Sequence, residues 1–226
     1  DNRFQSGKKK LSHTKNLFVK NYNYINCQLY DEYNNNKKNI SQDYITHIDA
    51  DPNHEDDVKL RGRLSGSEIK KHYFNLNKTL ENLKKIFNKK IIICIHPLYN
   101  INQTKKYFPN YRVIKYKTKY FIEKSFLVTF FDSSIIFNAI YLNKNILILK
   151  NNNLGLSLNQ KINLYQKFLN IPLINIFSKN LLNKKKMLLD FKHAKQKYKN
   201  YIVNEMLSYN KEYSYKVIKK YIKENE

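Results

Sequence analysis

The sequence predicts an α/β fold: a Rossmann-like parallel sheet flanked by helices. Short apolar runs alternate with segments of helical periodicity between residues 43 and 190. Several runs are continuously apolar, such as residues 91–95, and strands buried on both faces of a parallel sheet have this composition. Aliphatic, aromatic and cysteine residues make up 42% of the 226 residues, so the chain can bury a substantial core.

The first expected strand covers residues 43–50 and runs into a polar loop that contains Pro52. Ser65 or Ser67 is expected to cap the next helix, with Glu68 in its first turn. Apolar residues then recur at three- and four-residue steps as far as Phe87, which indicates a helix buried along one face. The alternation continues with strands at residues 91–95, 112–114, 126–130, 146–149 and 173–177 and helices at residues 118–124, 134–142 and 158–168.

These patterns divide the chain into three regions. Residues 1–42 are expected to be a linker or the remnant of an N-terminal half, and residues 43–190 form the Rossmann-like domain. Residues 191–226 are basic and rich in tyrosine, which predicts helices that either pack with a solvated lysine-rich face or lie on a membrane surface. No apolar run reaches the roughly 20 residues that span a bilayer, and two cysteines suggest no disulfide framework. A cytoplasmic protein, with at most peripheral contact to the inner membrane, is expected.

The chain is strongly basic, with 42 lysine and arginine residues against 18 acidic residues and a net charge of +24. Such a balance favours an anionic partner, and nucleic acid is the first class to consider. Only four of the basic residues are arginine, the usual reader of phosphates and bases, and the lysines are dispersed along the chain. We therefore expect no nucleic acid as partner, and a basic nucleic-acid-binding α/β module remains the alternative.

Polar residues gather where the expected strands end. The residues that follow three of the strands are suited to ligand binding: Asp51 and His54, His96 and Pro97, and Ser133 and Ser134. In an open parallel sheet, ligands bind outside the carboxyl ends of the strands. The sequence therefore predicts a ligand site at this edge of the sheet.

The serine pair and the histidine together predict a phosphate site. Ser133 can cap the helix that it begins, while the free N–H groups of the first turn bind an anion at the positive end of the helix dipole. His96 can donate a hydrogen bond or supply a positive charge to the same phosphate, and Pro97 fixes the turn that orients the ring. A serine at a helix start is most often only a cap, and a histidine after a strand is most often a surface residue. The prediction therefore depends on the combination.

Two stretches of this region resemble a known enzyme family. They are KKIIICIHP at residues 89–97 and TKYFIEKSFLVTFFDSSIIFNAIYLNKNILIL at residues 118–149. They resemble the donor-binding, C-terminal half of bacterial surface-polysaccharide glycosyltransferases of the GT-B fold, which carry an HP motif and an S/SS motif. This group includes sialyltransferases, polysialyltransferases and related capsule transferases that use CMP-activated sugars. The resemblance is strongest over residues 89–150 and extends more loosely from about residue 43 to the C-terminus.

The resemblance implies transfer of a sugar from a CMP-activated donor to a glycan acceptor in capsule or lipooligosaccharide biosynthesis. His96 would contact the nucleotide phosphate, Pro97 would shape its loop, and the serine pair, Ser133 and Ser134, would hold phosphate oxygens. The expected partners are a nucleotide-sugar donor and an anionic glycan or glycolipid acceptor. No cofactor and no metal are expected.

The general base that deprotonates the acceptor normally lies on the other half of such enzymes. Within this chain Asp51 and His54 are the candidates, and His96 completes the set of expected catalytic residues. The alternative for the first two is an ordinary solvated acidic loop, HEDD, at residues 54–57. A relative that keeps the sheet and binds nucleotide without turnover is a further alternative.

Overall fold

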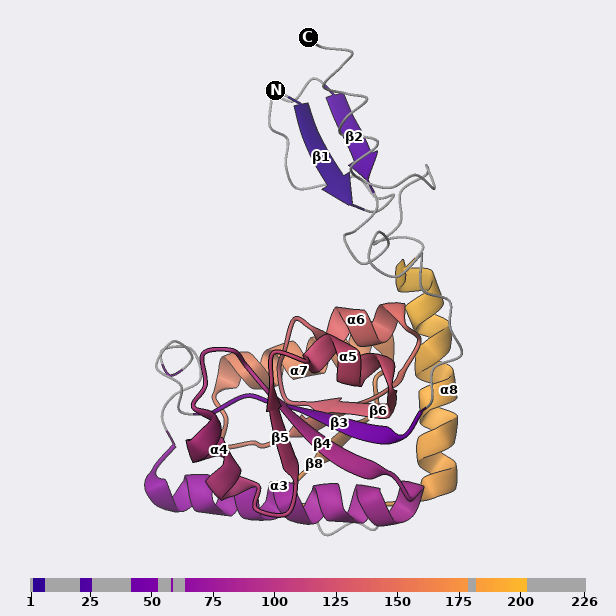
Figure 1. Ribbon diagram of the computed structural model, residues 1–226. Helices are drawn as coiled ribbons and strands as arrows, with labels where there is room; N and C mark the ends of the chain where they lie inside the picture. Colours follow the sequence, from indigo (N-terminus) through magenta and orange to yellow (C-terminus); the bar gives the residue numbers. More distant parts are fainter. Residues whose placement is uncertain are drawn as a thin grey trace. The chain divides into compact units, whose positions relative to one another are not determined.

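The computed structural model describes residues 2–6, 21–25, 42–52, 58, 64–178 and 182–202 (Figure 1). The chain divides into two compact units, Asp1–Asn39 with Tyr198–Glu226, and Ile40–Lys197. In the first unit, β1 (Asn2–Ser6) pairs in parallel with β2 (Asn21–Ile25). The region expected to be a linker or remnant thus contains two paired strands. His54 and residues 203–226 lie outside the described residues.

The second unit is built on a six-stranded parallel sheet, which confirms the predicted fold class. Its strands are β3 (Tyr44–Asp49), β4 (Lys90–Ile95), β5 (Arg112–Lys115), β6 (Ser125–Phe130), β7 (Asn145–Lys150) and β8 (Leu173–Asn175). Their order across the sheet is β5-β4-β3-β6-β7-β8. The chain begins in the middle, moves outward to β5, and then returns to the other side of β3, which is the doubly wound order of Rossmann-like folds.

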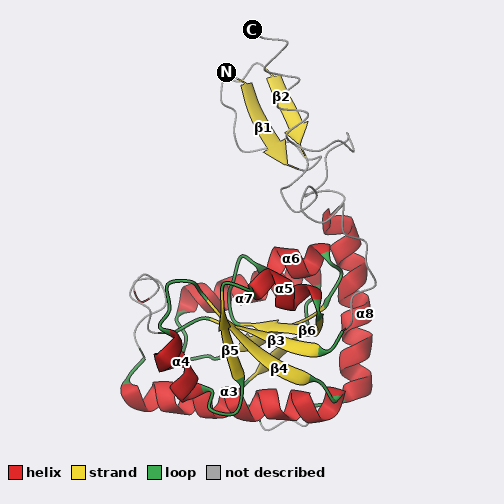
Figure 2. Ribbon diagram, viewed as in Figure 1, coloured by secondary structure: helices red, strands yellow, loops and turns green. Residues whose placement is uncertain are grey.

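Helices cover both faces of this sheet (Figure 2). On one face lie α3 (Gly66–Phe87) and α4 (Ile101–Tyr107), and on the other lie α5 (Thr118–Glu123), α6 (Ile136–Tyr141) and α7 (Leu156–Leu169). The last described helix, α8 (Lys184–Tyr201), begins before the expected boundary at residue 191, and its Phe191 ring lies 6.3 Å from that of Phe87.

Helix α3 begins where the sequence predicts. The Ser65 hydroxyl accepts a hydrogen bond from the Glu68 N–H at 3.3 Å, and the Glu68 carboxylate accepts one from the Ser65 N–H at 2.8 Å. The Ser65 hydroxyl also donates to the Glu68 carboxylate at 2.8 Å. The pKa of Glu68 is lowered, because the hydrogen bonds donated by the Ser65 N–H and hydroxyl favour the ionised carboxylate. The helix ends at Asn88, whose φ of 50° is left-handed.

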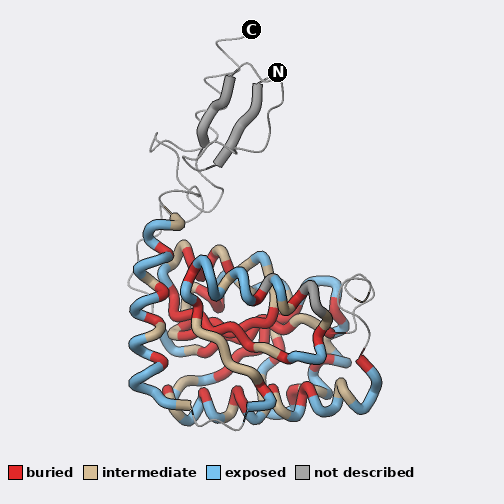
Figure 3. The backbone as a smooth tube through the Cα atoms, turned by 180° about the vertical axis from the view of Figure 1, so that it is seen from behind, coloured by how far each residue is buried: buried red, intermediate tan, exposed pale blue. Residues whose placement is uncertain are grey.

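The core lies between the central strands and the inner faces of the helices (Figure 3). Strands β4, β6 and β7 are buried almost throughout, as continuous apolar runs predict. On α3, Leu76, Leu80 and Leu83 are fully buried along one face. Each such side chain contributes on the order of 2 kcal/mol through loss of contact with water.

Strand β8 is shorter than the sequence predicts. It ends at Asn175, whose side-chain oxygen accepts a hydrogen bond from the N–H of Phe177 at 3.0 Å. Asparagine closes turns in this way, so the chain leaves the sheet before the apolar run is complete. The end of an apolar run is therefore not always the end of a strand.

Candidate functional site

The direction of the chain across the sheet reverses at β3. The register pairs Asp49 with Ile95 of β4, and Ile48 with Phe130 of β6. The segments that follow β4 and β6 therefore leave the sheet at the same edge, on either side of the segment that follows β3. Since neighbouring strands lie about 4.8 Å apart, these two exits are about 10 Å apart. Ligand sites of doubly wound folds form at such a reversal.

His96 follows β4 directly, and its side chain is exposed. Its Nδ1 accepts a hydrogen bond from the N–H of Leu98 at 3.3 Å, and its ring centroid lies 5.4 Å from that of Tyr99. With Nδ1 accepting, the proton of the neutral imidazole is on Nε2. His96 thus has an Nε2–H donor at the strand exit without needing a positive charge.

Ser133 and Ser134 follow β6, but they do not act as helix caps. Helix α6 begins at Ile136, two residues after the expected start, and Ile135 at its N-cap makes no side-chain hydrogen bond. The N–H groups of residues 136, 137 and 138 donate to the carbonyls of residues 133, 134 and 135 at 3.0–3.3 Å. Among the amides at the start of this helix, those of residues 136–138 are thus used inside the turn and are not free for an anion.

The two hydroxyl groups keep their capacity to bind an anion. Ser134 is exposed and Ser133 is half-buried, and neither hydroxyl forms a hydrogen bond within the described part of the chain. They stand at the exit of β6, at the same edge of the sheet as His96. This turn therefore offers two hydroxyl donors at the edge.

Asp51 lies at the exit of β3, between the other two segments, and its side chain is half-buried. Its negative charge is one of the causes that raise the pKa of Tyr73, after burial and the charge of Asp49. Asp51 is therefore close to Tyr73 and lies on the side of the sheet that α3 covers. The second candidate base, His54, is among the residues that the structure does not describe.

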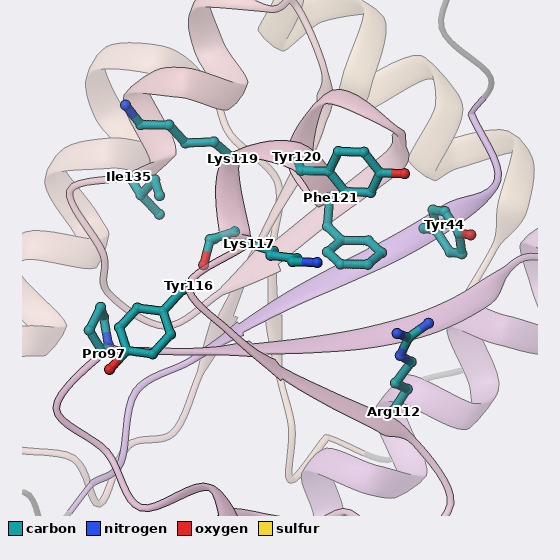
Figure 4. Close-up of a pocket in the computed structure, with 10 residues that line it drawn as sticks. Tyr44, Pro97, Arg112, Tyr116, Lys117, Lys119, Tyr120, Phe121 and Ile135 are labelled. Atoms are coloured by element: carbon teal, nitrogen blue, oxygen red, sulfur yellow. The ribbon is translucent and has the colours of Figure 1, made fainter.

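A cavity of about 840 Å³ reaches this edge of the sheet with one of its ends (Figure 4). Pro97 from the exit of β4 and Ile135 from the start of α6 line one end, where Tyr116 also lies, and Arg112 and Tyr44 line the other end. The remaining lining residues come from the segment around α5: Lys117, Thr118, Lys119, Tyr120 and Phe121. The cavity thus joins the neighbourhoods of the HP and SS motifs.

A buried polar cluster lies beneath the strand exits, and the sequence did not indicate it. His47 and Asp49 of β3 are buried, and the His47 Nε2 lies 3.6 Å from a carboxylate oxygen of Asp49. The His47 Nδ1 lies 3.0 Å from the hydroxyl of Thr129, and the Tyr73 hydroxyl donates to Asp49 at 3.5 Å. Asp49 lies within the expected strand, residues 43–50, and is the last residue of β3 in the structure. The spacing of His47 and Asp49, two residues apart in a strand, could have indicated a shared face.

His72 of α3 completes this cluster. It is fully buried, and its Nδ1 accepts a hydrogen bond from the side-chain amide of Asn151 at 3.0 Å. Burial lowers the pKa of His72 to about 4, and the nearby charge of Asp49 opposes this shift only in part. The imidazole is therefore neutral at physiological pH, where it connects α3 to the residue that follows β7.

Helix α4 is attached firmly to α3 near this edge. The rings of Tyr73 and Tyr107 are stacked, with centroids 4.0 Å apart and an angle of 6° between their planes. The side-chain amide of Asn77 donates to the Tyr107 carbonyl at 2.8 Å. Tyr107 therefore packs against another tyrosine, and the segment from His96 to α4 is held at both ends.

In the part of the chain that the structure describes, no three histidine, cysteine or acidic side chains are placed to hold a metal ion. None of the helices described is long and apolar enough to cross a bilayer. Cys94 is a buried free thiol, and burial raises its pKa to about 12. A protonated thiol of this kind packs as a small apolar side chain and is not a nucleophile.

No protein-family model and no curated protein matches the sequence. Solved structures similar to the chain include the UDP-GlcNAc 2-epimerase of Methanocaldococcus jannaschii in complex with UDP-GlcNAc and UDP. Its sequence is 13% identical, and the TM-score is 0.45 over 89% of this chain and 55% of that one. MnaA of S. aureus with UDP is 14% identical, at a TM-score of 0.42, over 90% of this chain and 53% of that one.

The UDP-GlcNAc 2-epimerase of Neisseria meningitidis bound to UDP-GlcNAc is 15% identical, at a TM-score of 0.37, over 88% of this chain and 48% of that one. The chain thus spans about half the length of these three structures. Similarity at this level establishes no activity for the chain.

Proposed function

We propose that the chain binds a nucleotide-activated sugar at the carboxyl ends of β3, β4 and β6 and acts in glycosyl transfer to a glycan acceptor. One observation carries this proposal. The segments with His96 and with the serine pair leave the sheet at the same edge, on either side of β3, and their neighbours Pro97 and Ile135 line one cavity. Hydrogen-bond donors from two strand exits can therefore approach one phosphate.

The donors at this edge are suited to stabilising a leaving phosphate. In glycosyl transfer the acceptor oxygen forms a bond to the anomeric carbon, and the electron pair of the breaking bond moves to the nucleotide phosphate. The Nε2–H of His96 and the hydroxyls of Ser133 and Ser134 would donate to the oxygens on which this charge develops. Asp51, at the exit of β3, would accept the proton from the acceptor hydroxyl.

The proposal also includes the chemical class of the sugar donor. Because the HP and SS motifs resemble those of transferases that use CMP-activated sugars, we propose a sugar donor of this type, used to build a capsule or lipooligosaccharide. The net charge of +24 supports anionic ligands, because donor and acceptor approach a positively charged protein. An acidic glycan or glycolipid is the acceptor class that fits this charge.

Thermal unfolding in the presence of nucleotides tests the binding step. A ligand at ten times its Kd stabilises the folded protein by about 1.4 kcal/mol, and we expect CMP to raise the Tm accordingly. UMP and UDP are measured in parallel, and a larger increase in Tm with either would assign the donor to uridine nucleotides. His96→Ala should remove most of the increase. His193→Ala is the matched control, because His193 is an exposed histidine on α8. Unchanged Tm values with every nucleotide would exclude the proposal.

Turnover separates an active transferase from a silent relative. We expect Asp51→Asn to keep the nucleotide-induced increase in Tm and to lose transfer of radiolabelled sugar to an acidic glycan, because the amide cannot accept the proton. Equal transfer by Asp51→Asn and the wild-type protein would show that another group is the base. Nucleotide binding without transfer by the wild type would support the silent relative.

A further inference from the structure

Tyr116 is an unusual residue at the end of the cavity that Pro97 and Ile135 also line. It follows β5, its φ is 67°, and its side chain is 75% exposed. The other non-glycine residues with positive φ in the described part of the chain are asparagines: Asn88, Asn143 and Asn170. Asparagine tolerates the left-handed conformation, whereas tyrosine is strained there.

Neither packing nor turn geometry accounts for a tyrosine at this position. Burial of its ring stabilises the fold little, since most of the ring is in contact with solvent. Asparagine or glycine would form the same turn with less strain. The ammonium group of Lys115 lies 5.3 Å from the ring centroid and partly supports the ring. An exposed aromatic ring in a strained backbone conformation is typical of a binding surface.

The register places Tyr116 next to His96. Lys115 of β5 pairs with Ile95 of β4, so the residues that follow them, Tyr116 and His96, leave neighbouring strands at the same level. Their backbones are therefore about one strand spacing, or 4.8 Å, apart. Across the edge of the sheet the order is Tyr116, His96, Asp51 and the serine pair.

The lining of the cavity is aromatic and cationic. Besides Tyr116 it includes Tyr44, Tyr120 and Phe121, and its charged groups are Arg112, Lys117 and Lys119. No carboxylate is among the described residues that line it. Its volume of about 840 Å³ lies within the range of small-molecule sites, roughly 300–1,000 Å³. A ligand that combines a flat ring with negative charge fits this chemistry.

We propose that the end of the cavity between Pro97, Tyr116 and Ile135 is the base-binding site of the nucleotide, with the base stacked on the exposed ring of Tyr116. This inference rests on the proposed function, because it takes the phosphate to lie between His96 and the serine pair. One ribose separates base and phosphate in a nucleotide, and one strand spacing separates Tyr116 from His96.

Comparison of ligands with and without a base tests the inference. Calorimetry on the full chain gives Kd values for CMP, UMP and inorganic phosphate, and for CDP, UDP and pyrophosphate. Loss of one stacked base weakens binding about ten-fold or more, so Tyr116→Ala should raise the Kd of the nucleotides by this factor and leave phosphate and pyrophosphate unchanged. Tyr116→Phe, which keeps the ring, should bind like the wild type.

Phe74→Ala is the matched control, since Phe74 is an aromatic residue on α3 that is 71% exposed and outside the cavity lining. An equal loss for nucleotides and for the base-free anions would overturn the base-binding site, as would no loss at all. Binding of pyrophosphate and nucleotides that depends on His96 but not on Tyr116 would leave the proposed function standing without this inference. If the wild type binds neither class of ligand, the proposed function and the inference fail together.

Discussion

The variant His72→Gln tests the cost of protonating a histidine that the fold buries completely. His72 is neutral in the folded protein, where its pKa is lowered to about 4, mainly by burial. An unfolded histidine titrates near pH 6.5. Between these two pH values the unfolded chain binds more protons than the folded one, so stability falls as the pH falls through this window. Below pH 4 both states are protonated and the loss is complete.

The size of the effect follows from the difference between the two pKa values. One pKa unit corresponds to about 1.4 kcal/mol, so acidification from pH 7 to pH 4 costs about 3 kcal/mol through His72. This is a large part of the 5–15 kcal/mol that typically stabilises a domain. Asp49 and His47 are the charged or titratable neighbours that modify the value, with Asp49 favouring and His47 opposing the protonated ring.

Urea unfolding followed by circular dichroism gives the free energy of unfolding at each pH. Glutamine can still accept the hydrogen bond from Asn151 but cannot be protonated, so His72→Gln should lose about 3 kcal/mol less than the wild type between pH 7 and pH 4. The exposed residue His193 is the control, and His193→Gln should follow the wild type. Parallel curves for the wild type and His72→Gln would refute the reasoning.

Three further variants test separate parts of the structure. Tyr116→Gly should relieve a strained φ of 67° and raise stability by about 1 kcal/mol, or the Tm by about 2–4 °C; a lower Tm would contradict the strain. Ser65→Ala removes the capping box of α3 and should cost about 1 kcal/mol in urea unfolding, whereas an unchanged midpoint would show that the cap contributes nothing. In a Cys27→Ser background, Cys94 should react with a thiol reagent at pH 8 only after addition of denaturant, because its thiol is buried with a pKa of about 12; fast labelling of the folded protein would exclude this.

The strands and the long helix could be predicted because their signals are local. The run at residues 91–95 is continuously apolar, which is typical of a strand buried on both faces of a sheet, and β4 is buried almost throughout. The capping box at Ser65 and Glu68 likewise depends on only four consecutive residues. Such features depend on residues that are close in the sequence, so they form in the structure where the sequence predicts them.

The details of the site could not be predicted in the same way. Whether Ser133 caps a helix depends on which carbonyls the first amides reach, and these amides donate to residues 133–135 instead. The cluster around His47 depends on Thr129, which is 82 residues away in the chain. The partners of buried polar groups are set by the order of strands, and no local pattern encodes that order.

The stacked pair of Tyr73 and Tyr107 determines how the loop between β4 and α4 can respond to a ligand. With α4 fixed on α3, only the few residues from His96 to Asn100 can adjust, and the Asn100 side chain already accepts hydrogen bonds from two amides of α4. The conformational entropy of this loop is therefore lost when the chain folds, and capture of a ligand requires little additional ordering. A ligand bound beside His96 would therefore meet a β4–α4 connection that is already ordered.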